Sequence, residues 1–239
     1  MSNIKLVHSG GNSVSLTTPD SNPAANRTFK LPGADGSSGQ AMVTDGSGAL
    51  SFATVGGVAT GGLIETITGQ CDGRVVVGAS GSYTFQNVTA HQTTTDSFLD
   101  LTGSTISYTP PSGTKKVVYR FSTFHSADSN SGITYFRLTV DGTEVTQARE
   151  TISYDYSSYA HSVGRLILEY TFITDASSED VTNGKFTSWS SAKTLKYQTR
   201  RHSSSYTANF HALKYWESGG SGGATSEVKI PMLTIQSFA

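Results

Sequence analysis

The sequence predicts an all-β fold: an antiparallel, jelly-roll-like sandwich head preceded by an extended N-terminal shaft or anchor of short strands. Three observations support this. The stretch 115–146 alternates apolar and polar residues with the period of two that is typical of strands. Turn-forming residues recur every 8 to 12 positions in the later part of the chain, which is the spacing of a sandwich. The sequence has no convincing helical pattern.

The central stretch, KKVVYRFSTFHSADSNSGITYFRLTVDGTEVT, is predicted to form two long strands and the start of a third. In the first strand, Val117, Tyr119 and Phe121 share one face. In the second, Ile133 and Tyr135 lie on one face and Phe136, Leu138 and Val140 on the other. Asp141-Gly142 supplies the positive-φ residues of a tight hairpin.

Residues 1–60 have a different composition, with turn signals every few residues such as Asn22-Pro23 and Asp45-Gly46. The strands predicted between these turns, such as 28–31, 41–44 and 50–52, are too short to bury a core within one chain. We therefore expect residues 1–60 to form an oligomerising shaft that attaches the chain to another protein. A flexible Gly/Ser linker is the alternative, which the interspersed Ile, Leu, Val, Phe and Met residues disfavour.

Residues 61–239 are expected to form the head, with about ten strands. Beyond the central stretch, the predicted strands are 62–68, 73–78, 82–88, 97–101, 105–108, 164–174, 186–189, 194–199, 206–216 and 228–238. Pro231 lies inside the last of these and cannot donate to a ladder, which predicts an edge or bulge position.

Charge and composition exclude several classes of partner. The chain has 17 Lys+Arg and 18 Asp+Glu, a net charge of −1, so we expect neither nucleic acid nor an anionic membrane as a general partner. No apolar run approaches the ~20 residues that span a bilayer, and the N-terminus lacks the pattern of a secretory signal. The single cysteine, Cys71, excludes an intrachain disulfide and is expected to be a half-buried apolar residue.

Two parts of the chain resemble virion proteins of tailed bacteriophages, especially marine phages that infect cyanobacteria. The opening NIKLVHSGGNSVSLTTPDSNPAANRTFKLPG is similar to their N-terminal signature, and GQAMVTDGSGALSF resembles a short unit that recurs in fibre shafts. In the head, LTGSTISYTPPSGTKKVVYRF, ITYFRLTVDGTEV and PMLTIQSF resemble C-terminal domains that are similar to the trimeric tumour-necrosis-factor-like jelly roll. The resemblance implies a structural protein of a virus particle, in the form of a homotrimer. It leaves the position on the particle open.

The pattern of apolar residues agrees with an oligomer. Several strands carry apolar residues on both faces, for example Tyr135 with Phe136 and Leu166 with Ile167. One face packs inside a sandwich and the other needs a second contact, because large exposed apolar patches are unusual on monomers.

Catalytic and metal-binding patterns are weak. The six histidines form no metal-binding motif, and packing or loop positions are the favoured interpretation; a histidine cluster on a trimer axis is the alternative. Glu144, Glu150, Asp155 and Glu169 are candidates for a glycosidase pair only by residue type. We therefore expect no enzyme, no cofactor and no metal site.

The sequence suggests two sets of functional residues. Tyrosines among serines in SYDYSSYAHS (153–162) resemble adaptable binding loops, and RRHSSSY (200–206) adds cations to the same candidate surface for a sugar. Packing at a subunit interface is an equally favoured role for these tyrosines. The candidate receptor-binding residues are Tyr154, Tyr156, Tyr159, Arg200 and Arg201. The candidate virion-docking residues are Ile4, Leu6, Val14, Leu16, Phe29 and Leu31.

The expected function is that of a tail fibre: a virion component, made in the host cytoplasm, whose N-terminus binds other virion proteins and whose head contacts a host-surface glycan or receptor. A decoration or head-fibre protein with an architectural role only is the first alternative. A polysaccharide-degrading spike is the second.

Overall fold

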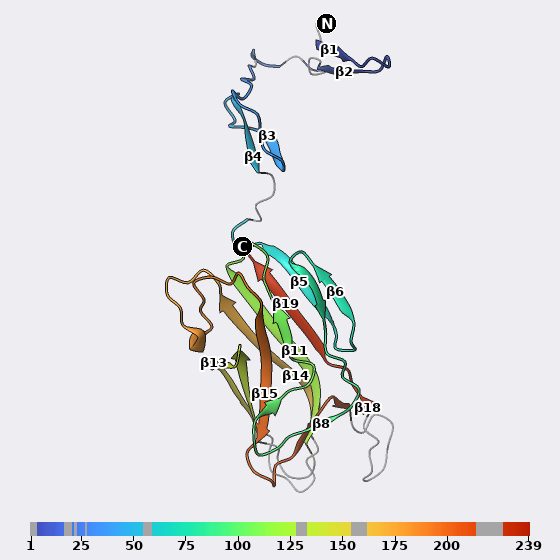
Figure 1. The fold of residues 1–239 in the computed structure, drawn as a ribbon, viewed down its shortest axis with the longest axis vertical. Coiled ribbons are helices and arrows are strands. Elements are labelled where there is room, and N and C mark those ends of the chain that lie inside the picture. The colour runs from blue at the N-terminus through green and yellow to red at the C-terminus, as the bar shows by residue number, and fades with distance from the viewer. Residues whose placement is uncertain are drawn as a thin grey trace. The chain divides into compact units, whose positions relative to one another are not determined.

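The computed structural model describes residues 4–16, 21, 23–26, 28–54, 59–127, 133–153, 162–213 and 227–239. The chain divides into two compact units, Met1–Gly57 and Val58–Ala239 (Figure 1). Strands dominate both units, and within the described residues the only helical element is the 3-10 turn η1 (Val181–Asn183). The prediction of an all-β fold is confirmed.

The N-terminal unit contains two antiparallel hairpins. The first joins β1 (Ile4–Val7) to β2 (Ser13–Leu16), and the second joins β3 (Gln40–Thr44) to β4 (Leu50–Thr54). The predicted strand at 28–31 is reduced to a single bridge between Lys30 and Ala49. Isolated two-stranded hairpins are marginally stable in water, and the described residues of this unit contribute none of the buried core side chains.

The head contains two antiparallel sheets. Sheet I has the order β14-β11-β19-β5, and β16 and β8 continue it beyond the end of β19. Sheet II has the order β13-β12-β15-β10, with β9 also pairing with β15. The bounds are β5 (Leu63–Gln70), β8 (Gln92–Thr93), β9 (Leu99–Asp100), β10 (Ile106–Tyr108), β11 (Lys116–Ala127), β12 (Thr134–Val140), β13 (Thr143–Ile152), β14 (Ser162–Ile173), β15 (Lys193–Arg201), β16 (Ala208–Phe210) and β19 (Met232–Phe238). Outside the two sheets lie the hairpin of β6 (Val75–Gly78) and β7 (Gly81–Thr84) and the pair β17 (Ala212–Leu213) and β18 (Glu227–Val228).

The chain crosses repeatedly between the two sheets, as in a jelly roll. From β10 in sheet II it passes to β11 in sheet I, returns for β12 and β13, and then crosses to β14, β15 and β16 in turn (Figure 1). Each crossing places sequence neighbours on opposite sides of one shared core.

The core contains the residues that the alternation predicts. Val117, Tyr119 and Phe121 of sheet I are fully buried, as is Leu138 of sheet II, and the Tyr119 ring stacks on that of Tyr197 across the sandwich with centroids 5.5 Å apart. Phe136 and Val140 are also buried. The Asp141-Gly142 hairpin is present, with φ values of 50° and 85°.

Three predictions about strands are wrong. Residues 186–189 form no strand; instead Phe186 and Trp189 are buried with their ring centroids 5.0 Å apart. The predicted strand 206–216 breaks at His211, whose φ of 60° is incompatible with an extended chain. Pro231 precedes β19, and this strand lies in the middle of sheet I rather than at its edge. Cys71 is fully buried rather than half-buried, and burial raises its pKa to about 12.

The two ends of the head differ. At one end the first residues of the head meet the last, because Gly61 N–H donates to the Ala239 carbonyl (2.6 Å) and Ala239 N–H donates to that of Gly62 (2.9 Å). At the opposite end, called the far end below, Thr134 pairs with both Ile152 and Arg201.

Candidate functional site

The outer face of sheet II carries a row of aromatic and arginine side chains. Tyr135 on β12 is the direct cross-strand partner of Arg200 on β15. Phe98 lies just before β9, whose pairing with β15 brings it next to Arg200 on the other side. Because paired residues point to the same face of a sheet, strand register alone assembles a ring, a guanidinium and a second ring in one row.

The contacts in this row are close. The Arg200 guanidinium carbon lies 4.5 Å from the ring centroid of Tyr135 and 5.3 Å from that of Phe98. Arg137, two residues from Tyr135 on the same strand, places its guanidinium 4.2 Å from the Phe98 centroid. These are cation–π distances.

The row continues toward the far end. The Tyr135 hydroxyl lies 2.7 Å from Nδ1 of His202, with ring centroids 5.9 Å apart, and the rings of His202 and Tyr206 are separated by 5.6 Å. We call Arg137, Phe98, Arg200, Tyr135, His202 and Tyr206 the arginine–aromatic ladder.

A cleft of ≈ 370 Å³ opens beside the ladder and adds two carboxylates to it. Glu144 accepts from Nε of Arg149 at 2.5 Å and from Nη1 of Arg137 at 3.3 Å. The hydrogen bond from Arg149 lowers the pKa of Glu144. Glu150 lines the same cleft, and desolvation raises its pKa.

Arg200 differs from its neighbours in having no carboxylate partner among the described residues. Its guanidinium donates one hydrogen bond, from Nη1 to the Arg201 carbonyl at 3.3 Å. A guanidinium has five N–H donors, so most of those of Arg200 have no partner among the residues that the structure describes and face the cleft that this side chain lines.

The other predicted receptor-binding residues have different positions. Arg201 pairs with Asp96 at 2.8 Å and donates to Thr207 Oγ1 at 3.1 Å, so its side chain holds two loops together. Tyr154, Tyr156 and Tyr159 lie outside the described residues. The flanking residue Ile152 lies in the same row as Thr134 and Arg201.

Sequence reasoning missed Phe98, Tyr135 and Arg137. The signal that could have found them is the run of outward positions Lys196, Gln198 and Arg200 on one strand facing Tyr135 and Arg137 on the next. Using it requires the register between β12 and β15, which the sequence does not state.

The predicted docking residues lie in the N-terminal unit. The β1–β2 register pairs Ile4 with Leu16 and Leu6 with Val14. Leu6 and Phe29 are exposed, and Leu31 is 75% exposed. Such exposure of large apolar side chains is typical of a surface that binds another protein.

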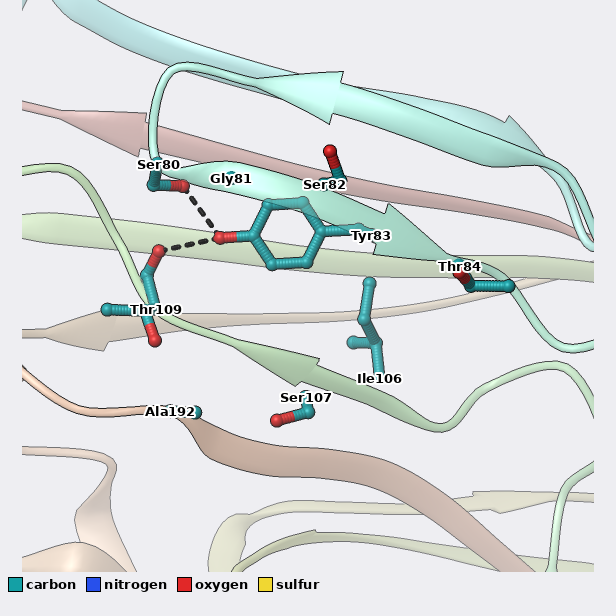
Figure 2. Close-up of a pocket in the computed structure, with 9 residues that line it drawn as sticks. All are labelled: Ser80, Gly81, Ser82, Tyr83, Thr84, Ile106, Ser107, Thr109 and Ala192. Atoms are coloured by element: carbon teal, nitrogen blue, oxygen red, sulfur yellow. Dashed lines mark hydrogen bonds between the residues drawn. The ribbon is translucent and has the colours of Figure 1, made fainter.

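A second cavity, of ≈ 400 Å³, lies between β7, β10 and Ala192 (Figure 2). Its hydroxyl groups bond to the protein itself: Tyr83 OH donates to the Thr109 carbonyl at 2.8 Å and lies 2.7 Å from Ser80 Oγ, as Figure 2 shows. Ser80 in turn donates to the buried carboxylate of Glu65 from both its N–H (2.8 Å) and its hydroxyl (2.7 Å). These hydrogen bonds join the β6–β7 hairpin to the sandwich, and the cavity lies at this junction.

Searches for two other kinds of site gave negative results within the described residues. No three His, Cys, Asp or Glu side chains come together in a way that could hold a metal ion. None of the helical structure there has the length and apolar character needed to cross a membrane.

Comparison with protein-family models and with curated proteins finds no match to this chain. The candidate site therefore depends on the geometry of the ladder itself.

Proposed function

We propose that this chain is a non-enzymatic virion protein of a tailed phage, a homotrimeric fibre whose N-terminal unit attaches to the particle and whose head contacts the host surface. The observation that carries the proposal is the contrast between the outer faces of the two sheets. The outer face of sheet I exposes large apolar side chains, whereas that of sheet II exposes none among the described residues.

The outer face of sheet I exposes a group of large apolar side chains. Ile167 is 51% exposed, and it and Met232 are both cross-strand partners of Ser122. At the end near the C-terminus, Ile173 and Leu63 are exposed on the same face, in one row with Lys116 and Phe238. Between these two apolar rows lie Arg120, Glu169 and Thr171. The two rows support self-association, because a second copy of the chain would remove their apolar side chains from water. The threefold order comes from the resemblance to tumour-necrosis-factor-like jelly rolls.

The outer face of sheet II is different. Among the described residues, none of the exposed large apolar side chains lies on β9, β10, β12, β13 or β15. This face instead carries the arginine–aromatic ladder and a chain of polar contacts, in which Arg137 donates to Gln198 (2.8 Å) and Gln198 donates to Asp100 (2.7 Å). A face of this composition suits a polar ligand better than a second copy of the chain.

The ladder extends toward the end of the head that lies opposite the meeting of Gly61 and Gly62 with Ala239. This separation supports a role of the ladder in contacting a target.

Immunoelectron microscopy tests the virion assignment. Antibodies against the full chain are expected to label intact particles of the phage that encodes it. The labelled purified protein is expected to bind host cells and to compete with infection. Unlabelled particles would contradict the proposal.

An architectural decoration protein is the first alternative. It predicts labelled particles, no binding of the purified protein to cells, and loss or instability of particles when the gene is deleted.

A polysaccharide-degrading spike is the second alternative, and one observation favours it: Glu144 and Glu150 share a cleft and have pKa values shifted in opposite directions. Against it, two arginines already hold Glu144. Of the other predicted carboxylates, Glu169 pairs with Arg120 on sheet I and Asp155 lies outside the described residues. Release of reducing sugar from host envelope, abolished by Glu150→Gln, would establish this activity.

A further inference from the structure

We infer that the arginine–aromatic ladder binds a carboxylate-bearing sugar residue of an acidic polysaccharide, with the carboxylate on Arg200 and the sugar ring against the neighbouring aromatic side chains. This inference rests on the proposed role of the head in contacting a surface. It names the chemical class of the ligand and the residue that selects it.

Arg200 lies between two aromatic rings and has no carboxylate partner in the described chain. Two rings flank its guanidinium at 4.5 and 5.3 Å, which restrains the position of the group. No carboxylate of the described chain neutralises it, although Arg137, Arg149 and Arg201 all have acidic partners. A restrained, unpaired guanidinium is a ready bidentate site for a carboxylate.

The side chains that line the cleft carry a net positive charge. Its lining includes Arg137, Arg149 and Arg200 together with Glu144 and Glu150. Three cations against two carboxylates leave one positive charge, which a monoanionic carboxylate balances. A doubly charged phosphate would add repulsion from the two glutamates.

The side chains around the cleft suit a sugar better than an acidic peptide. The rings of Tyr135, His202 and Tyr206 continue from Arg200 toward the far end, tilted against one another by 57° and 61°, and a pyranose can place its C–H groups against one such ring. Glu150 and Thr151 line the same cleft and can accept hydrogen bonds from sugar hydroxyls. The sheet II face offers no exposed large apolar side chain, in the described residues, to receive a peptide anchor.

Calorimetric titration of the full-length protein tests the inference. The probe is tri-α-1,4-galacturonate, and its methyl ester serves as a neutral probe of the same shape. The acid is expected to bind and the ester to bind roughly tenfold or more weakly, because esterification removes the charge that Arg200 recognises. No binding of the acid at millimolar concentration, or equal binding of the ester, would overturn the inference.

Variants locate the site. Arg200→Gln is expected to weaken binding of the acid roughly 10- to 100-fold, with little effect on binding of the ester. Phe98→Ala is expected to weaken it roughly tenfold, through loss of the ring that orients the guanidinium. Arg120→Gln, on the outer face of sheet I, is the matched control and should bind like the wild type. If Arg200→Gln retains its melting temperature and its affinity for the acid, the ladder is not the site.

Two further experiments distinguish a failure of this inference from a failure of the proposed function. A triglutamate peptide that binds as tightly as the sugar, and is equally sensitive to Arg200→Gln, would overturn the assignment to a saccharide. If the protein labels particles and binds host cells while Arg200→Gln binds those cells equally well, the proposed function stands and this inference fails. If the sugar binds but particles stay unlabelled, the proposed function fails alone.

Discussion

Buried polar side chains give the head its most testable individual contacts. The Tyr108 hydroxyl donates to Glu65 Oε1 at 2.8 Å and lies 2.5 Å from Ser237 Oγ, inside the sandwich. Desolvation raises the pKa of Tyr108 far above its ordinary value, so the phenol keeps the proton that it donates. Glu65 is almost fully buried, and a buried carboxylate is tolerated only while its donors remain.

Tyr108→Phe is therefore expected to lower the free energy of unfolding by about 1–3 kcal/mol, since it leaves the Glu65 carboxylate short of a donor. Tyr135→Phe, which removes a hydroxyl from the exposed contact with His202, is the control and should cost less than about 1 kcal/mol. Urea unfolding measures both. Equal stability of Tyr108→Phe and the wild type would show that the network contributes nothing.

His211 gives the head a pH dependence. It is fully buried, its Nδ1 lies 2.8 Å from Thr123 Oγ1, and desolvation lowers its pKa from 6.5 to about 4. Below pH 6.5 the unfolded chain takes up a proton at this residue and the folded chain does not, so stability falls as the pH falls.

We expect His211 to account for a loss of up to about 2 kcal/mol between pH 6.5 and 5, before most carboxylates titrate. In His211→Asn, which tolerates the positive φ, the loss should be smaller by this amount. Unfolding by urea at several pH values measures it. If the free energy of unfolding depends on pH in the same way in the wild type and in His211→Asn, the pKa of His211 is not depressed.

Part of the candidate site could be predicted from the sequence, residue by residue. Arg200 was identified from composition, in a cationic stretch next to serines and tyrosine. Phe98 and Tyr135 were not, because they are distant in sequence and meet Arg200 only through strand pairing.

The alternation of apolar and polar residues predicted the long strands of the head well. β11, β12 and β14 each bury one face, so the period of two is strong in their sequences. Alternation failed where tertiary packing replaced strand pairing. Phe186 and Trp189 look like strand residues, but they pack around Phe172 from a loop, with centroids 6.1 and 5.5 Å from its ring. The break at His211 was equally absent from the sequence pattern, because His211 is fully buried and contacts Thr123, a residue distant in sequence.

The β12–β13 hairpin was predictable from its turn residues, and its geometry yields a further prediction. Gly142 has a φ of 85°, where a Cβ is strained. Gly142→Ala should destabilise the head by about 1 kcal/mol and lower its melting temperature by roughly 2–4 °C.

Gly164→Ala is the matched control for that substitution. Gly164 has no positive φ, and a Cβ there would meet only His125 Cε1 at an ordinary 3.8 Å. We expect its melting temperature to be unchanged or slightly higher. If calorimetry gives the two variants equal melting temperatures, the strain assigned to the turn is wrong.

For the whole molecule, the two sheet faces make opposite predictions about assembly. Ile167→Lys places a charge among the exposed apolar side chains on the outer face of sheet I and is expected to dissociate the oligomer, because a buried unpaired charge is strongly unfavourable. Gln147→Lys adds the same charge to an exposed position on β13 and should leave assembly unchanged. Light scattering after size exclusion compares the two. Dissociation by both variants, or by neither, would contradict the assigned interface.

Sedimentation equilibrium of the intact chain at micromolar concentration tests the central claim most directly, namely that this polypeptide is complete only as an assembly. The chain mass is 25.3 kDa, and the account predicts a single species of three times that mass. A well-folded species of 25.3 kDa that does not associate would contradict it.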